Sequence, residues 1–221
     1  MSLLINGLIK FMLGLLAVGL LLFLPAGTLA YWQGWLFIAL LFIPMALVGI
    51  ILYCKTPDLL AKRLASRESE KIQQLVVILS AVVFCCGFVL AGLDFRFGWS
   101  EMPIGLAVLA AVLQLFAYGI YAEVMRENAY LSRTVEVQEN QKVVDTGLYG
   151  IVRHPMYSAV ILLFLSIPIV LGSWLCFCLF LLCPLILIIR IINEEKVLEE
   201  GLEGYSAYKK RVKYRLLPFI W

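Results

Sequence analysis

A short stretch in the second half of the chain, residues 147–157, gathers side chains that could do chemistry. It contains His154, the only histidine of the sequence, between Arg153 and Pro155. Pro155 lacks a backbone N–H and biases His154 away from helical torsion angles, so Arg153 and His154 are expected on extended chain just before a helix that Pro155 opens. Backbone amides and two basic side chains would then face one place. Such a cluster could bind an anionic ligand, or it could anchor the chain to lipid headgroups.

The composition is that of an integral membrane protein. Of the 221 residues 63% are hydrophobic, and the mean hydropathy is +0.96, which is too apolar for a soluble domain of this length. The six cysteines lie within or at the ends of apolar runs, with no Cys-x-x-Cys motif. We therefore predict neither a disulfide framework nor a zinc site.

Charge-free runs divide the chain into the helices that must position residues 147–157. Residues 11–54 carry no charge, and at about 1.5 Å per residue they exceed a hydrocarbon core of roughly 30 Å, so two spans must share them. The break is expected at Pro25-Ala26-Gly27. Residues 55–71 are polar and predict an amphipathic surface helix that starts at Thr56-Pro57. The predicted spans lie near residues 8–24, 32–54, 72–93 and 102–122.

Residues 155–189 are also free of charge, but they are too many for one crossing and too few for two standard ones. Leu171-Gly172-Ser173, with Pro168 just before it, is typical of a turn. We predict a tight hairpin of two short helices whose ends, at His154 and Arg190, return to one side of the membrane. The expected fold class is all-α, a polytopic membrane protein with about six transmembrane helices and a C-terminal cytosolic helical segment.

The basic residues predict the orientation of these helices. Of the 18 lysines and arginines, all but Arg96 fall in segments on one side of the predicted spans. The positive-inside rule then predicts both termini in the cytoplasm, in the plasma membrane of a prokaryote or the endoplasmic reticulum membrane of a eukaryote.

Two charged residues follow the hairpin, Arg190 and Glu194, one helical turn apart on one face. By themselves they could form a surface ion pair. The predicted hairpin, however, returns them to the level of Tyr149 and His154. A carboxylate, a guanidinium, an imidazole and several tyrosines are thus expected to converge on one pocket at the membrane surface.

From about residue 128 to its end the sequence resembles the isoprenylcysteine carboxyl methyltransferase family, within the wider group that includes the phospholipid N-methyltransferases. The resemblance implies a single domain of N-terminal transmembrane helices (residues 1–127) and a catalytic methyltransferase region (residues 128–221). It rests on short motifs in the family's order and spacing: Gln141-Lys142-Val143-Val144 leading into Gly147-x-Tyr149, Arg153-His154-Pro155-x-Tyr157, Arg190-x-x-x-Glu194-Glu195-x-x-Leu198, and Tyr205-x-x-Tyr208-x-x-x-Val212 before Leu217-Pro218.

The resemblance implies an enzyme that transfers a methyl group from S-adenosylmethionine to a lipid-borne acceptor, above all the carboxylate of a prenylated cysteine or a similar isoprenoid thiol acid. It implies that Arg190 binds this acceptor and that Arg190 and Arg153 are catalytic. The expected partners are the bilayer and a lipid or prenylated substrate, with neither metal nor nucleic acid. The residues implied to bind the cofactor are Gln138, Gln141, Lys142, Val143, Val144, Tyr149, His154, Pro155, Met156, Tyr157 and Glu194.

Three alternatives stay open. The acceptor could be a phospholipid amine, as in the N-methyltransferases of the wider group. Membrane sterol and steroid reductases, which use NADPH, share the Arg-His-Pro-x-Tyr motif and a closing Tyr-Arg-x-x-Pro, but their acidic pair is typically Asp-Glu, whereas Glu194-Glu195 follows the methyltransferase pattern. A non-enzymatic lipid-binding protein with the same fold is the third alternative.

Overall fold

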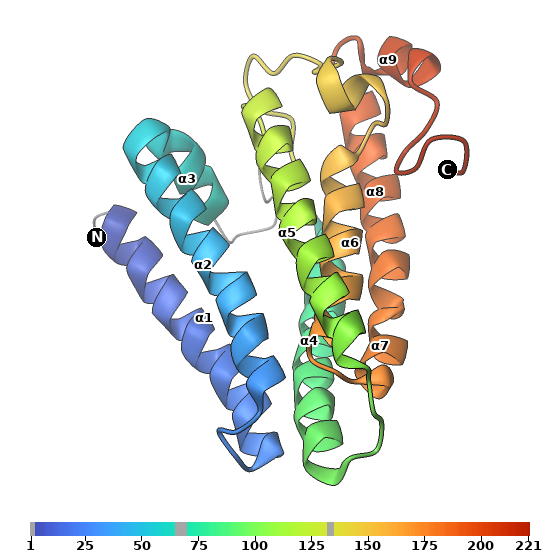
Figure 1. Cartoon of the computed structure of the whole chain (residues 1–221). Helices are drawn as coiled ribbons and strands as arrows, with labels where there is room; N and C mark the ends of the chain where they lie inside the picture. Colours follow the sequence, from blue (N-terminus) through green and yellow to red (C-terminus); the bar gives the residue numbers. More distant parts are fainter. Residues whose placement is uncertain (1–2, 65–69, 132–134) are drawn as a thin grey trace.

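The computed structural model describes residues 3–64, 70–131 and 135–221 as a bundle of long helices (Figure 1). Helix makes up 76% of the structure, without a strand in the described ranges, which confirms the predicted all-α class. In chain order the elements are α1 (Leu3–Ala26), α2 (Trp32–Lys55), α3 (Pro57–Leu64), α4 (Lys71–Phe97), α5 (Ile104–Glu127), the 3₁₀ turn η1 (Gly147–Gly150), α6 (Pro155–Val170), α7 (Trp174–Phe180), α8 (Leu182–Gly201) and α9 (Tyr205–Arg211).

Five stretches of the described chain are long and apolar enough to cross a membrane. They are α1, α2, α4, α5 and the run Trp174–Gly201, which α7 and α8 form together. The apolar helix α6 is shorter, at 16 residues. The described chain thus has five candidate spans and one shorter apolar helix, where about six membrane helices are predicted from the sequence. The break between the first two lies at the predicted place, because α1 ends at Ala26.

The hairpin turns where the sequence predicts. Helix α6 ends at Val170, and Gly172 follows with φ of 76°, a left-handed conformation that glycine adopts without strain. Ser173 then caps α7, since its hydroxyl accepts a hydrogen bond from the backbone N–H of Cys176 at 3.1 Å.

The second arm of the hairpin is longer than predicted. Helix α8 continues past Arg190 to Gly201, because the residues there include the strong helix formers Glu, Lys and Leu. In this second arm, residues 174–189 are free of charge. As a helix they span about 24 Å along the axis, which is less than a hydrocarbon core of roughly 30 Å. Arg190 therefore lies partway along a continuous helix rather than at its end.

A buried carboxylate, Asp94 near the end of α4, holds the turn of the hairpin. Asp94 is 1% exposed and accepts hydrogen bonds from the backbone N–H and the hydroxyl of Ser100, at 2.7 and 2.5 Å, and from the hydroxyl of Ser173. Nearby, the Tyr31 hydroxyl donates to the Leu171 carbonyl at 2.6 Å. Such groups are costly to bury unpaired, so these bonds fix the turn against α4 and the start of α2.

Close packing joins the hairpin to α4 along its length. The ring of Phe180, on α7, lies against Gly87 of α4, where a Cβ atom would be 2.3 Å from the ring. Phe84 and Phe88 lie on either side, with ring centroids 5.1 and 6.5 Å from that of Phe180. The glycine thus allows a close approach that any larger residue would prevent.

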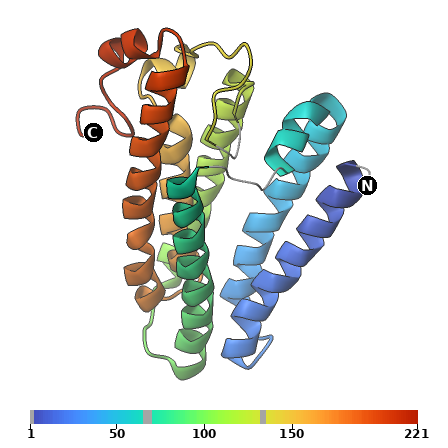
Figure 2. The ribbon, with the colours of Figure 1, turned by 180° about the vertical axis from the view of Figure 1, so that it is seen from behind.

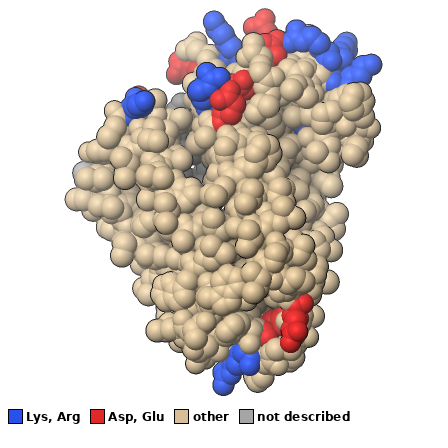
Figure 3. Space-filling view, viewed as in Figure 1, with Lys and Arg blue, Asp and Glu red and all other residues tan. Residues whose placement is uncertain are grey.

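Both chain ends lie at the same end of the bundle (Figure 1), and the view from behind shows the same arrangement (Figure 2). In the space-filling view the charged side chains gather at the two ends, with a broad uncharged band between them (Figure 3). Helix α9 lies at the end with the termini, and the loop after α4, next to Arg96, lies at the other. This separation fits the charge asymmetry of the sequence, and the side of the membrane that each end faces stays a prediction.

Two exposed residues at opposite ends make the orientation testable. Ser206 lies on α9, and Trp99 follows α4. In a cysteine-free background, Ser206→Cys should react with a membrane-impermeant maleimide only from the cytoplasmic side, and Trp99→Cys only from the other side. Labelling of both positions from one side would contradict the predicted topology.

Candidate functional site

The chain just before α6 is non-helical at His154, as predicted, although its ψ angle is not that of extended chain. His154 has φ of −128° and ψ of 59°, and Pro155 opens the helix. The backbone N–H groups of Arg153 and His154 donate to the carbonyls of Tyr214 and Arg215, each at 2.9 Å. Buried amides need such partners. These two amides therefore hold the C-terminal segment, residues 212–221. They are not available to bind a ligand, contrary to the expectation from the sequence.

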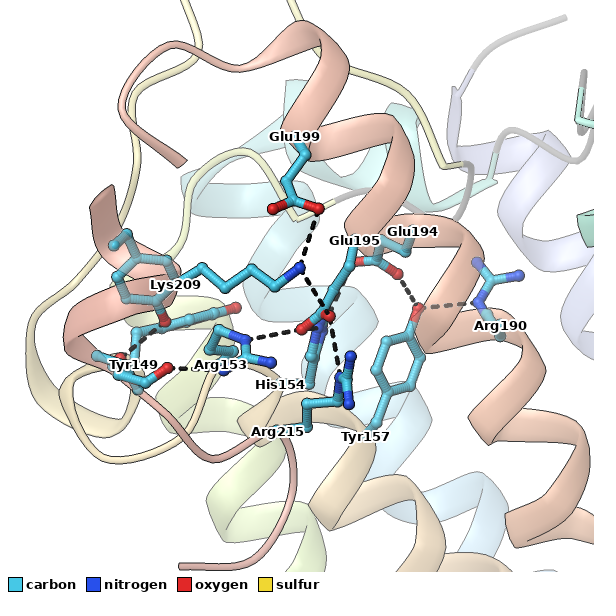
Figure 4. A network of polar contacts seen from close by, with 12 residues as sticks. Tyr149, Arg153, His154, Tyr157, Arg190, Glu194, Glu195, Glu199, Lys209 and Arg215 are labelled. Carbon is cyan, nitrogen blue, oxygen red and sulfur yellow. Dashed lines mark hydrogen bonds and ion pairs between the residues drawn. The ribbon is translucent and has the colours of Figure 1, made fainter. Parts of the chain in front are cut away.

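A second buried carboxylate, that of Glu195 in α8, is contacted by basic side chains from several parts of the chain (Figure 4). It is 2% exposed. Its Oε1 accepts a hydrogen bond from Arg153 Nε at 2.7 Å and lies 3.3 Å from Nε2 of His154, while its Oε2 accepts from Arg215 Nε at 2.9 Å. An ionised carboxylate is costly to bury unless it is paired and hydrogen-bonded. These contacts therefore tie α8 to the start of α6 and to the C-terminal segment.

Arg153 also binds the C-terminal segment directly. Its Nη1 donates to the carbonyls of Val212 and Lys213, at 2.7 and 2.8 Å, and the residue is 6% exposed. Its guanidinium thus contacts a carboxylate and two backbone carbonyls of the protein itself. These bonds keep the C-terminal segment against the start of α6.

A row of polar contacts runs from α8 through α6 to α4. The Tyr157 hydroxyl donates to a carboxylate oxygen of Glu194 and accepts from Nε of Arg190 at 2.9 Å. Beyond it, Nη1 of Arg190 donates to the side-chain oxygen of Gln73 at 2.9 Å. Nδ1 of His154 lies 3.9 Å from Glu194. Arg190 and Glu194 share a face of α8, as predicted, and both bind the hydroxyl of Tyr157, which connects them.

These residues line a pocket at the end of the bundle that carries the termini. The cavity has a volume of about 100 Å³, which is smaller than the roughly 300–1,000 Å³ typical of small-molecule sites. Most of the residues predicted for the site line it together: Gln141, Lys142, Val143, Val144, Tyr149, Arg153, His154, Met156, Tyr157, Arg190 and Glu194.

Two residues predicted to bind the cofactor, Gln138 and Pro155, are not part of the lining. Pro155 instead sets the start of α6. The backbone N–H of Gln138 donates to the side-chain oxygen of Gln141 at 2.8 Å, and its side-chain amide donates to the Tyr130 carbonyl at 2.5 Å. Both residues thus shape the chain that forms the pocket wall.

Tyrosines complete the wall on the side of α9. Tyr205 and Tyr208 both line the pocket. The Tyr208 hydroxyl donates to the Tyr149 carbonyl at 2.8 Å, and the Tyr149 hydroxyl accepts from the Asn128 amide at 2.9 Å. Burial raises the pKa of Tyr205 and of Tyr208 well above the usual range. Both hydroxyls therefore stay protonated, and that of Tyr208 acts as a hydrogen-bond donor.

Several residues at the pocket have no role in the sequence prediction. Glu195, Tyr205 and Tyr208 stand in the quoted motifs, but no role was predicted for them. The sequence prediction also gives no role to Gln73, although the amides of Gln73 and Gln74 in the first turn of an apolar span are a usable signal, because polar groups in a membrane helix need partners. Asn128 carried no such signal, since its position at the pocket depends on how the chain after α5 folds.

The fold and the site define an all-helical membrane protein with a polar pocket at one end of the bundle. Residues 104–203 match the phospholipid methyltransferase family, the family that includes the isoprenylcysteine carboxyl methyltransferases. This match confirms the predicted resemblance and indicates a membrane methyltransferase. No match was found among curated proteins. The matched region includes α5, α6 and α8, whereas Gln73 and α9 lie outside it.

The buried position of Glu195 gives a testable stability difference. Glu195→Ala should destabilise the protein by about 3–5 kcal/mol, because it leaves the Arg153 guanidinium buried without its carboxylate. Glu199→Ala, one turn along α8, is the matched control. Glu199 pairs with Lys209 at 2.9 Å with its side chain 37% exposed, and an exposed pair contributes about 1 kcal/mol or less. Thermal unfolding in one detergent compares them, and equal effects would contradict the role of Glu195.

Proposed function

We propose that this protein transfers a methyl group from S-adenosylmethionine to the carboxylate of a membrane-borne lipid, a prenylated cysteine or a similar isoprenoid thiol acid. The observation that carries the proposal is the row Glu194, Tyr157 and Arg190 inside the region that matches the methyltransferase family. The row has an acid and a guanidinium on opposite sides of one tyrosine hydroxyl. A cationic and an anionic ligand group could therefore bind next to one another.

The chemistry of the pocket lining suits this methyl donor. Glu194, with its side chain 22% exposed, can accept hydrogen bonds from an ammonium group or a hydroxyl. His154 and Lys142 can donate to a carboxylate, and the ring of Tyr149 can pack against an adenine. When bound, S-adenosylmethionine supplies a methyl group already activated on a sulfonium, so a carboxylate acceptor needs no general base.

Arg190 is the residue that we propose for binding the acceptor. A guanidinium can hold a carboxylate through two parallel hydrogen bonds, which fixes the direction of the attacking oxygen. Arg190 lies beside Tyr157 on the pocket wall, at the contact between α8 and α4. The contribution of the protein is then to orient two reactants and to exclude water.

For Arg153 we propose a positioning role in place of the catalytic one that the sequence suggested. Its guanidinium donates to Glu195 and to two carbonyls of the C-terminal segment. Through these bonds it would keep His154 and the C-terminal segment in place, without touching the reactants.

A phospholipid amine is the second candidate acceptor, favoured by the name of the matched family. An amine must lose a proton during methylation, and Glu194 is a carboxylate of the pocket that could accept it. The two acceptors therefore need different residues. A carboxylate acceptor depends on the Arg190 guanidinium, and an amine depends on a base.

Calorimetric titration of the purified protein tests the class of cofactor. We expect saturable binding of S-adenosylmethionine and no binding of NADPH. Binding of NADPH alone would favour a reductase, and the absence of binding to either would favour a non-enzymatic lipid-binding protein. Both results would contradict the proposal.

The residues proposed for the cofactor give a second prediction. His154→Ala and Glu194→Ala should each weaken S-adenosylmethionine binding by about 1–3 kcal/mol, the usual contribution of a hydrogen bond to a charged group. Glu200→Ala, an exposed acid near the end of the same helix, should bind as tightly as the wild-type protein. Unchanged affinity in both folded pocket variants would remove these residues from the site.

A third prediction concerns Arg190. Arg190→Lys keeps the charge but loses the fixed two-bond geometry, so turnover of a carboxylate acceptor should fall by an order of magnitude or more. Cofactor affinity should stay within about threefold. A fully active Arg190→Lys protein would exclude the carboxylate-binding role and would move the assignment towards the amine.

A further inference from the structure

A glutamine outside the matched family region contacts the proposed acceptor residue. Gln73 is the third residue of α4 and is 0% exposed. The view from behind shows the first turns of α4 lying alongside α8 (Figure 2). The side chain of Gln73 therefore lies between two membrane helices and not in solvent. An amide in such a place is costly unless its hydrogen bonds are made.

Both ends of the Gln73 amide bind the same residue. Its oxygen accepts from Nη1 of Arg190 at 2.9 Å, and its nitrogen donates to the backbone carbonyl of Arg190 at 3.2 Å. A reversed amide would lose both bonds, so the orientation of the side chain is determined. On the other side Arg190 Nε donates to the Tyr157 hydroxyl at 2.9 Å. Gln73 and Tyr157 thus fix the plane of the guanidinium from two helices.

The chemical type of Gln73 also matters. An amide oxygen holds a guanidinium without adding a negative charge, in contrast to Glu195, which pairs its carboxylate with Arg153 and Arg215. A carboxylate at position 73 would compete with an acidic acceptor for the same cation.

We infer that Gln73 is a positioning residue for Arg190 and makes the site selective for acidic over amine acceptors. This inference rests on the proposed function. It assigns to α4, which lies outside the family match, a direct part in choosing the acceptor. In this assignment α4 is more than a packing partner of the hairpin, because it supplies the group that sets how the guanidinium is held.

The experiment uses the purified full chain in lipid nanodiscs, with a synthetic N-acyl S-prenylcysteine as the acidic probe. Gln73→Met keeps the length of the side chain and removes both hydrogen bonds. It should raise the KM for the probe at least tenfold, while the Kd for S-adenosylmethionine stays within twofold. Gln73→Glu should lose more of the probe turnover than Gln73→Met, because the new carboxylate competes for Arg190.

A second buried glutamine supplies the control. Gln114 of α5 is 1% exposed and does not line the pocket, so Gln114→Met should leave both constants within twofold of the wild-type values. If Gln73→Met behaves like this control, the inference is wrong. An equal loss of cofactor and probe affinity would also overturn it, because that pattern indicates a general distortion of the pocket.

A double-mutant cycle tests whether Gln73 acts through Arg190. In an Arg190→Lys background, adding Gln73→Met should change the remaining turnover by less than twofold, since the geometry that Gln73 supports is already lost. A further tenfold fall would contradict the coupling. Wild-type protein that does not bind S-adenosylmethionine, or that methylates amine lipids alone, overturns the proposed function and the inference that rests on it. Methylation of the probe with unchanged KM in Gln73→Met overturns the inference alone.

Discussion

The site depends on one buried carboxylate, that of Glu195. It is buried in α8, which with α7 forms one of the candidate membrane spans, so its charge must be paired within the protein. The partners are Arg153 and His154 before α6 and Arg215 in the C-terminal segment. Three segments that are far apart in sequence are thereby held around one pocket. The positions of His154 and Tyr157, and the attachment of the C-terminal segment to the start of α6, follow from this pairing.

The opposite end of the bundle supplies the matching constraint. Asp94 and Tyr31 hold the turn between α6 and α7, and the fit of Phe180 against Gly87 fixes the hairpin along α4. With the turn held, α6 and α8 cannot slide independently, so Tyr157, Arg190 and Glu194 stay in register. Polar contacts at both ends of the bundle thus determine where Tyr157, Arg190 and Glu194 lie along its axis, since the middle of the bundle is apolar.

Much of this arrangement could be predicted from the sequence. Charge-free runs indicated the helices, Gly172 indicated the turn, and the spacing of Arg190 and Glu194 indicated a shared face. The contact between Gln73 and Arg190 could not be predicted, because it joins residues 117 positions apart and depends on how two helices pack. The length of α8 was underestimated because the end of an apolar run need not be the end of a helix. The use of the Arg153 and His154 amides by the C-terminal segment also depends on tertiary contacts.

The central claim is that the pocket brings an activated methyl group to an acidic lipid. Incubating membranes that contain the protein with methyl-labelled S-adenosylmethionine tests this most directly, because methyl esters and N-methyl amines differ in their stability to alkali. The account predicts that most of the lipid-associated label is released by mild base, as expected of an ester on a carboxylate. Label that enters membrane lipids and resists base would contradict the carboxylate acceptor, and the absence of any transfer to lipid would contradict the account as a whole.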